Sequence, residues 1–267
     1  MSDYSIVRNQ YDRMAEMEEQ RLKDHPMERL VTLDTISLHL GPHLDVPLKI
    51  ADIGGGTGVY AFILAKQGHS VHLRDLSPGL LVIASEEQAG NAVYMDSMFR
   101  PSDEGTFDAV LLLGPLYHIV DEADRLAAIS NALKLLKDSG TLFASFVSIN
   151  AHIRGIAIRD PGRLLREPEF YDEYLRSGHY VRRGERNAES FHASLSEIQP
   201  LIERAGGTVL EIVGVEGILG GGLDKFMAEA GDHVIQAWLH LMKDLGRRPE
   251  NLGNADHWLA VIRKPVN

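Results

Sequence analysis

The sequence contains no cysteine among its 267 residues. A chain without cysteine forms no disulfide, no iron–sulfur cluster of the cysteine-ligated kind and no cysteine-ligated zinc site, and it has no thiolate nucleophile. Such a chain also tolerates a reducing compartment. We therefore expect a cytoplasmic protein, and any covalent thiolate mechanism is excluded.

Long apolar runs and an excess of positive charge are also missing. No stretch approaches the ~18 to 20 uncharged residues that span a bilayer, and the charged N-terminal segment does not resemble a signal peptide. The 27 basic and 38 acidic side chains give a net charge of −11, which repels a phosphate backbone. The basic stretch 176–186 could contact nucleic acid, but a solvated surface is the favoured interpretation. We expect no membrane and no nucleic-acid partner, and the oligomeric state stays open.

Short apolar runs alternate with amphipathic segments along most of the chain. Repeated strand–helix units of this length indicate an α/β fold with a parallel, doubly wound sheet, because each parallel neighbour needs a crossover helix. The expected strands cover 48–53, 70–74, 92–95, 107–113, 141–149, 208–215 and 257–264, and the expected helices cover 59–67, 78–88, 122–137, 196–205 and 223–245.

Three further segments surround this pattern. Amphipathic spacing over residues 3–40 predicts an N-terminal helical cap, 1–45, in front of a main domain, 46–267. Within the main domain, 150–194 and 217–254 interrupt the alternation after strand ends. Segments at that position are well placed to cover a site and select its ligand, so we expect two lid insertions.

The sharpest signal is a glycine loop, residues 52–58, at the end of the first expected strand. Its glycines Gly54, Gly56 and Gly58 follow the spacing G-x-G-x-G, whereas the dinucleotide fingerprint requires G-x-G-x-x-G. Asp75 ends the second strand, where a carboxylate can accept both hydroxyls of a ribose. A tight strand-to-helix turn is the alternative, but the loop and the acid together favour a nucleoside-type ligand.

Four features together resemble class I S-adenosylmethionine (SAM)-dependent methyltransferases. These are the string D-I-G-G-G-T-G at 52–58, Asp75, the pair Asp96-Ser97 after the third strand, and the segment F-D-A-V-L-L-L-G-P-L-Y-H-I at 107–119. The string L-L-L-G-P-L-Y-H at 111–118 resembles the small-molecule, bacterial-type branch. The resemblance implies a Rossmann-like, seven-stranded, mostly parallel sheet with an antiparallel last strand.

The resemblance also implies which residues bind SAM. The loop Gly54, Gly55 and Gly56 would line the methionine moiety, and Asp52 would orient its amine. Asp75 would contact the ribose and Leu76 the adenine ring, and Asp96 with Ser97 and Met98 would contact the adenine edge. Leu113 and Gly114 would face the sulfonium methyl. Tyr11, or less favourably Arg21, would contact the carboxylate.

The resemblance implies direct in-line transfer of a methyl group to O, N or S of a small-molecule acceptor. One alternative is a protein that binds SAM or its product S-adenosylhomocysteine (SAH) without transferring a methyl group. A weaker alternative is an NAD oxidoreductase. A base is needed only if the acceptor must lose a proton. The candidates are His118, Tyr117 and His192, although each could simply pack in the pocket wall.

Other features narrow the acceptor. The chain lacks the Asn/Asp-Pro-Pro-Tyr/Phe motif of DNA amino-methyltransferases, so base amines are not expected targets. Acids at 121–124 are explained as the start of a helix, so we expect no metal. Further candidates for the pocket lie in the first insertion: Tyr171, Tyr174, His179 and Phe191.

Overall fold

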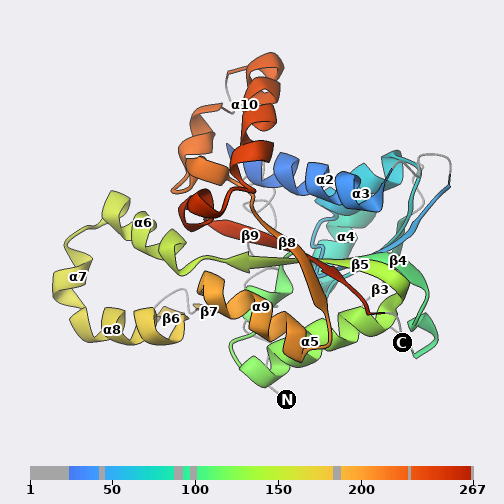
Figure 1. Cartoon of the computed structure of the whole chain (residues 1–267), viewed down its shortest axis with the longest axis horizontal. Helices are drawn as coiled ribbons and strands as arrows, with labels where there is room; N and C mark the ends of the chain where they lie inside the picture. Colours follow the sequence, from blue (N-terminus) through green and yellow to red (C-terminus); the bar gives the residue numbers. More distant parts are fainter. Residues whose placement is uncertain are drawn as a thin grey trace.

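A computed structural model of the chain describes residues 24–41, 46–86, 93–96, 101–182, 188–227 and 230–265. The centre is a seven-stranded sheet in the order β3-β2-β1-β4-β5-β9-β8 (Figure 1). The last strand, β9, runs antiparallel to both of its neighbours, β5 and β8. The strands are β1 (Lys49–Ile53), β2 (Ser70–Arg74), β3 (Val93–Asp96), β4 (Phe107–Leu112), β5 (Leu136–Val147), β8 (Thr208–Gly214) and β9 (His257–Arg263).

Helices cover both faces of this sheet, which is why the central strands are apolar almost throughout. In β4, for example, only Asp108 is not fully buried. One face packs against α5 and α9 and the other against α2, α3 and α10 (Figure 1). The helices of this framework are α2 (Pro26–Leu40), α3 (Val59–Lys66), α4 (Pro78–Glu86), α5 (Glu122–Leu135), α9 (Leu195–Arg204) and α10 (Asp232–Leu245).

The mixed α/β, Rossmann-like fold with a mostly parallel sheet is confirmed, but two element boundaries were wrong. The helix expected over 122–137 ends at Leu135, and β5 begins at Leu136 instead of Thr141. Leu136 pairs with Phe107 of β4, so sheet pairing ends the helix before Gly140. The helix expected over 223–245 is split: η4 (Leu223–Met227) precedes α10, and Gly231 between them has a positive φ of 84°.

The segment between β5 and α9 has more regular structure than its sequence suggests. It forms an arm that extends away from the sheet (Figure 1). Its aromatic side chains form a separate small core in which Phe170 stacks on Tyr174, with ring centroids 6.0 Å apart. Its elements are α6 (Ile149–Arg159), α7 (Arg163–Arg166), α8 (Pro168–Ser177), β6 (His179–Arg182) and β7 (Ala188–Phe191).

The described part of the predicted N-terminal cap is α2, which packs on the sheet and on α10. Lys243 of α10 pairs with Asp34 at 2.6 Å, and His39 contacts Glu211 of β8 at 2.6 Å. Among the described residues, no helix combines the length and the apolar character that crossing a bilayer requires. Short 3-10 helices complete the chain: η1 (Pro101–Asp103), η2 (Pro115–His118), η3 (Gly217–Leu219) and η5 (Pro249–Asn254).

Candidate cofactor and acceptor site

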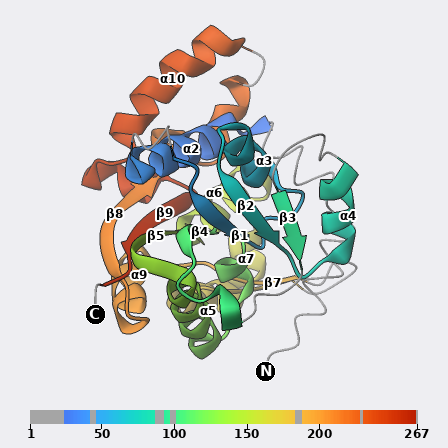
Figure 2. The same cartoon turned by 90° about the vertical axis from the view of Figure 1, so that its right-hand side faces the viewer.

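The predicted site residues of β1, β2 and β4 converge because these strands are parallel neighbours. Asp52 of β1 pairs with Leu73 of β2 on one side and with Leu111 of β4 on the other. The glycine loop, Asp75 and Leu113 follow these strands and therefore meet at one edge of the sheet. Figure 2 shows β1, β2 and β3 side by side at this part of the molecule. Ligands of open α/β sheets bind at the carboxyl ends of the strands.

The glycine loop is held against both neighbouring strands. The N–H groups of Gly54 and Gly55 donate to the carbonyl of Arg74, at 2.6 and 3.3 Å. A β carbon on Gly54, whose φ is +67°, would lie 2.5 Å from Cγ of Pro115 in η2. A β carbon on Gly55 would lie 2.5 Å from Oδ2 of Asp52. Both positions therefore require glycine.

Asp75 ties the glycine loop to the chain after β2. Its Oδ2 accepts the N–H of Gly56 at 2.9 Å, and its Oδ1 accepts the N–H of Ser77 at 2.8 Å. The next residue, Leu76, is 63% exposed, so its side chain is accessible to a ligand. The expected contacts of Asp75 with a ribose and of Leu76 with an adenine remain predictions.

Asp52 is the most unusual group of the loop. Its side chain is buried, and its Oδ2 has no hydrogen-bond partner among the residues that the structure describes. Burial, and then the negative charge of Asp75, raise the pKa of Asp52 to about 7, although the backbone N–H of Ala61 opposes this shift. A carboxylate in this position favours a positively charged ligand, because a cation offsets the cost of burying its charge.

Tyr117 and His118 lie in η2, directly after β4, and their ring centroids are 4.7 Å apart. Gly114 brings this turn against the loop, since a β carbon there would lie 3.4 Å from the carbonyl of Gly54. Burial lowers the pKa of His118 to about 4. His118 is therefore a neutral imidazole at neutral pH, and its catalytic role remains a prediction, as does that of Tyr117.

His192, the third catalytic candidate, belongs to the aromatic core of the arm. Tyr174 Oη lies 2.6 Å from its Nδ1, and Ser190 Oγ lies 3.0 Å from its Nε2. Its ring stacks on Tyr180 at 5.7 Å. Burial first, and then the charges of His152, His257 and His118, lower the pKa of His192 to about 4. Both ring nitrogens have partners, an arrangement typical of a packed histidine, and an acid/base role for it stays a prediction.

The remaining predicted residues are placed only in part. The backbone of Asp96 pairs with Arg74 at the end of β3, and its side chain is not among the described ones. Tyr11, Arg21, Ser97 and Met98 lie outside the described residues. Tyr171 and Tyr174 are buried in the arm, where His179 and Phe191 lie in β6 and β7.

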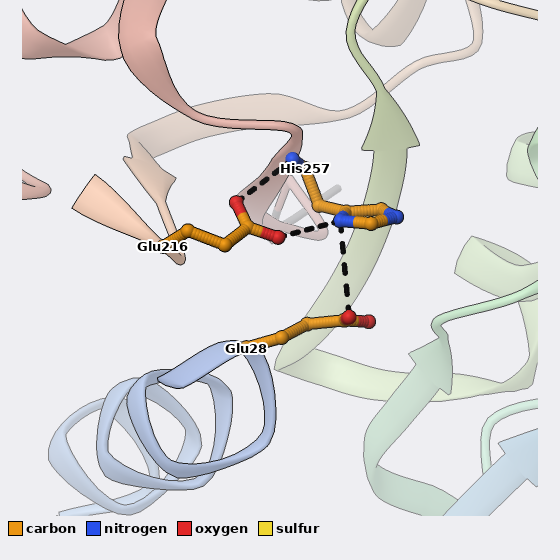
Figure 3. A group of neighbouring side chains, drawn as sticks. All are labelled: Glu28, Glu216 and His257. Atoms are coloured by element: carbon orange, nitrogen blue, oxygen red, sulfur yellow. Dashed lines mark hydrogen bonds and ion pairs between the residues drawn. The ribbon is translucent and has the colours of Figure 1, made fainter. Parts of the chain in front are cut away.

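A second polar group was not predicted from the sequence (Figure 3). Nδ1 of His257, the first residue of β9, lies 2.6 Å from Oε1 of Glu216 and 3.8 Å from Oε2 of Glu28. Oε2 of Glu216 accepts the N–H groups of Asp256 and His257, both at 3.0 Å. Glu28, Glu216 and His257 are far apart in sequence. The only local signals for this group were weak: an acid, Glu216, after one strand and a histidine, His257, at the start of another.

The ligand atoms of Glu28, Glu216 and His257 lie within 4.8 Å of one another, a spacing that could also suit a metal ion. However, both oxygens of Glu216 already accept hydrogen bonds, and one of these comes from the His257 ring. We therefore interpret the group as a hydrogen-bonded carboxylate–imidazole pair with a second carboxylate beside it. Figure 3 shows that Glu28 approaches the ring from α2 and Glu216 from the turn after β8.

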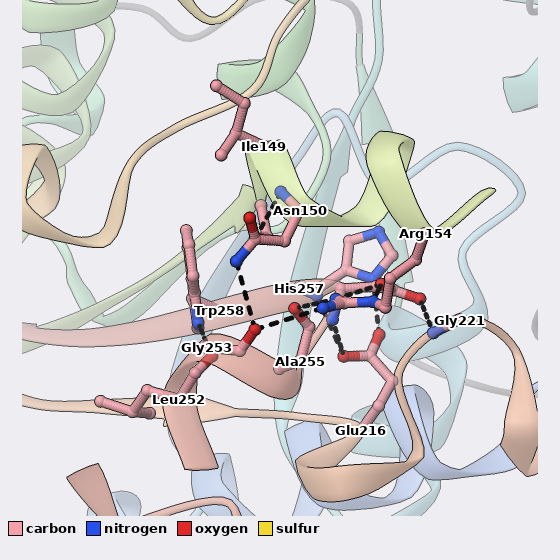
Figure 4. A network of polar contacts seen from close by, with 12 residues as sticks. Ile149, Asn150, Arg154, Glu216, Gly221, Leu252, Gly253, Ala255, His257 and Trp258 are labelled. Carbon is pink, nitrogen blue, oxygen red and sulfur yellow. Dashed lines mark hydrogen bonds and ion pairs between the residues drawn. The ribbon is translucent and has the colours of Figure 1, made fainter. Parts of the chain in front are cut away.

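An arginine fixes the start of β9 next to this pair (Figure 4). Arg154 of α6 donates to Asp256 Oδ1 from Nε and Nη2, at 3.0 and 2.5 Å, and to the carbonyl of Ala255 at 2.6 Å. Asp256 Oδ2 accepts the N–H of Gly221 at 2.6 Å. These contacts join three parts of the chain beside His257: the arm, the segment that follows β8, and β9 itself.

Comparisons with known proteins agree with this architecture. Residues 50–140 match the family model described as "Methyltransferase domain". A ubiquinone biosynthesis O-methyltransferase from Xanthomonas campestris is 30% identical over 130 residues, which are 46% of this chain and 53% of that protein. The matched region of this chain thus spans about half the length of that relative. The protein of the same name from Methylococcus capsulatus is 29% identical over 224 residues, 82% of this chain and 77% of that protein.

A solved structure supports the fold over the whole chain. Magnesium protoporphyrin IX methyltransferase from Synechocystis, with bound SAH, superposes with a TM-score of 0.60 at 16% identity. The superposition covers 98% of this chain and 100% of that one. Residues 50–140 therefore carry a methyltransferase domain, and the fold is that of SAM-dependent methyltransferases.

Proposed function

We propose that this chain is a methyltransferase that moves the methyl group of SAM to oxygen, nitrogen or sulfur of a small organic acceptor. The observation that carries the proposal is the buried Asp52, whose Oδ2 lies without a hydrogen-bond partner among the described residues beneath a glycine loop. The methyltransferase domain matched at 50–140 supports the same activity.

The chemistry of the loop fits SAM. The cofactor carries a positive ammonium group and a positive sulfonium group, and Asp52 offers a buried, desolvated carboxylate. The loop also leaves room at Gly56, where a β carbon would meet only Cδ1 of Leu80, at 3.9 Å. We propose that Asp52, Gly54, Gly55 and Gly56 hold the methionine part.

The adenosine part would be held by the residues after β2 and β3. Asp75 and the exposed Leu76 follow β2, and Asp96 ends β3 beside them. We extend the proposal to Ser97, Met98 and Tyr11, which lie outside the described residues, because of the sequence resemblance alone. Leu113, at the end of β4, would face the reacting methyl group.

When bound, SAM supplies a methyl group that its sulfonium has already activated. The protein then has to hold the acceptor in line and keep water away, and orientation alone can lower a barrier by ~7 to 11 kcal/mol. We propose that segments 150–194 and 217–254, which follow the carboxyl ends of β5 and β8, cover the acceptor. The names of the two curated relatives favour an oxygen acceptor.

Methyl transfer can be tested with SAM that carries a labelled methyl group. The protein is incubated with panels of phenols, catechols, thiols and amines, and the label in each acceptor is counted. We expect label in at least one class of acceptor and formation of an equal amount of SAH. SAH binding without any labelled acceptor would instead support a binding protein of the same fold, and the absence of SAH binding would contradict the proposal.

A further inference from the structure

We propose that a cavity between α5, α9 and β7 binds a small organic carboxylate, and that Arg125 pairs with the charge of this ligand. The inference goes beyond the proposed function and does not rest on it. It assigns a chemical class of ligand, a monocarboxylate with an apolar body, to a residue that the sequence did not single out.

The cavity lies beside α5 and α9, which run next to each other on one face of the sheet (Figure 1). Its volume of about 330 Å³ is at the lower end of the range for small-molecule sites. Part of its lining is apolar: Phe146 of β5 and Leu201 of α9 are buried, and Phe191 of β7 packs beside them. The space therefore suits a molecule of modest size with an apolar body.

Arg125 of α5 places a buried positive charge in the wall of this cavity. The residue is 4% exposed, and its guanidinium lies over the ring of Phe191, with Cζ 3.5 Å from the ring centroid. Nη1 donates to the carbonyls of Ile119 and Val120, at 2.8 and 2.6 Å. Among the residues that the structure describes, no carboxylate forms an ion pair with Arg125, although buried charges are generally paired.

The guanidinium keeps hydrogen-bond donors for a ligand. Nη1 uses its two N–H groups on the two carbonyls, whereas Nε and Nη2 donate to none of the described residues. In Arg163, the same two nitrogens donate together to Glu167, at 3.1 and 2.9 Å. In Arg154 they donate together to Asp256. This edge of Arg125 is the one that matches a carboxylate, and because Nε is covered, we expect Nη2 to make the first contact.

The other charged groups of the cavity lie at its rim and already have partners. Arg204 of α9 forms an ion pair with Glu122, and both side chains are more than half exposed. Oε2 of Glu197 accepts the N–H of Ser194 at 2.8 Å. Burial lowers the pKa of Arg125, and the charges of these two carboxylates oppose that shift. Because the two acids balance the two arginines, the site favours a ligand with one negative charge over a phosphate.

The cavity adjoins the turn after β4. Arg125 holds Ile119 and Val120, which follow η2, and η2 packs against β7. Two sources of the carboxylate are therefore compatible with the site. It is either part of the methyl acceptor or part of a separate molecule that binds beside the acceptor, and the chemistry at Arg125 is the same for both.

Fluorine NMR with 4-fluorobenzoate tests the site on the whole chain without SAM. We expect saturable binding that benzoate displaces, and at least about tenfold weaker binding of the neutral 4-fluorobenzamide. Inorganic phosphate at the concentration of the benzoate should displace much less of the probe. The absence of saturable binding, equal affinity for the two fluorinated probes, or equal displacement by phosphate would overturn the proposal.

Two variants test whether the probe binds in this cavity. Arg125→Met should weaken 4-fluorobenzoate binding by at least about tenfold, whereas Arg159→Met, at an exposed position on α6, should change it by less than about twofold. Since Arg125 also holds the turn after η2, Ser196→Trp provides a second test, because it fills the cavity from its exposed rim. Gln199→Trp, exposed on the same helix, is its control. Unchanged binding in either Arg125→Met or Ser196→Trp would overturn the proposal.

Methylation kinetics then distinguish the two sources of the carboxylate. If it belongs to the acceptor, the wild type should prefer 3,4-dihydroxybenzoate to catechol by at least about tenfold in kcat/KM, and Arg125→Met should remove the preference. If it belongs to a separate molecule, the preference should be absent, and benzoate should bind without competing with the acceptor. Either result supports a carboxylate site. A protein that binds benzoate but neither SAM nor SAH would lose the proposed function and keep this site, so the two failures are distinguishable.

Discussion

Pro115 packs directly on Gly54. A β carbon on Gly54 would lie only 2.5 Å from Cγ of Pro115, so the turn after β4 forms one wall of the glycine loop. This contact joins the two sequence motifs that pointed most clearly to a cofactor. It means that the shape of the loop depends on a residue about sixty positions later in the chain, and a small change at either residue should alter ligand binding.

A double-substitution experiment tests this contact. Gly54→Ala should lower the free energy of unfolding by about 2 to 4 kcal/mol, because it adds left-handed backbone strain to a clash with Pro115. It should also weaken SAH binding by at least about tenfold. Pro115→Ala in the same chain should restore part of both losses, since it removes the clash and leaves the strain. Gly253→Ala is the control, because no atom lies within 4 Å of the added carbon.

The raised pKa of Asp52 predicts a pH-dependent affinity for the cofactor. In the ligand-free protein its pKa is raised from 3.8 to about 7, so the protonated form is favoured below pH 7. The positive ammonium group of the ligand, which we propose Asp52 to hold, needs the ionised form. Affinity should therefore fall as pH drops through 7, by about tenfold between pH 8 and pH 6. Calorimetric titration with SAH at several pH values measures this.

Two variants complete the pH experiment. Asp52→Asn should bind SAH weakly and with little change between pH 6 and pH 8, because the titrating group is gone. Asp138→Asn, at an exposed position on β5, should keep the wild-type slope. A slope that persists in Asp52→Asn would show that another group controls the pH dependence. The stability of the ligand-free fold should depend on pH in the opposite direction. Protonated Asp52 contributes stability below pH 4, and this contribution is lost as pH rises through 7.

Removal of Arg154 should loosen the start of β9. Arg154→Met loses the two-pronged contact with Asp256 and the bond to the carbonyl of Ala255. We expect the free energy of unfolding in urea to fall by about 1.5 to 3 kcal/mol. The exposed Arg159 on the same helix provides the control, and Arg159→Met should change stability by less than about 0.5 kcal/mol. Equal effects of the two variants would contradict a special role for Arg154.

The hydroxyl of Tyr174 should matter for stability. It lies within hydrogen-bond distance of the carbonyl of Ile149, at 3.0 Å, and of Nδ1 of His192, at 2.6 Å. Tyr174→Phe leaves both groups without this partner inside the arm, so we expect a loss of about 1 to 3 kcal/mol in thermal or urea unfolding. Ser190→Ala, which removes the more exposed partner of His192, should cost less. A larger loss of stability for Ser190→Ala than for Tyr174→Phe would contradict this prediction.

Much of the cofactor half could be predicted from the sequence because its signals are local. The apolar run at 107–112 and the glycine spacing at 54–58 each depend on a few adjacent residues, and the parallel sheet brings them together without further information. Boundaries set by pairing between distant segments were harder. Leu135 and Leu136 look alike in sequence, and only the partner Phe107 decides where the helix stops.

The second polar group could not be predicted from the sequence for the same physical reason. Glu28, Glu216 and His257 come from a helix, a turn and a strand, and their proximity is a property of the complete sheet. In the arm, the spacing of Phe170, Tyr171 and Tyr174 is helical, but the rings of both tyrosines contact His152, which lies outside α8. Polar aromatic residues pack as core only where such a partner is present.

Calorimetric titration of the protein with SAH tests the central claim, that this fold binds SAM and uses it, most directly. The account predicts binding at micromolar concentrations, a loss of at least about tenfold in affinity for Asp75→Ala through the loop contact with Gly56, and an unchanged affinity for Asp138→Ala. No heat of binding with SAH, together with binding of NAD by the same sample, would contradict it.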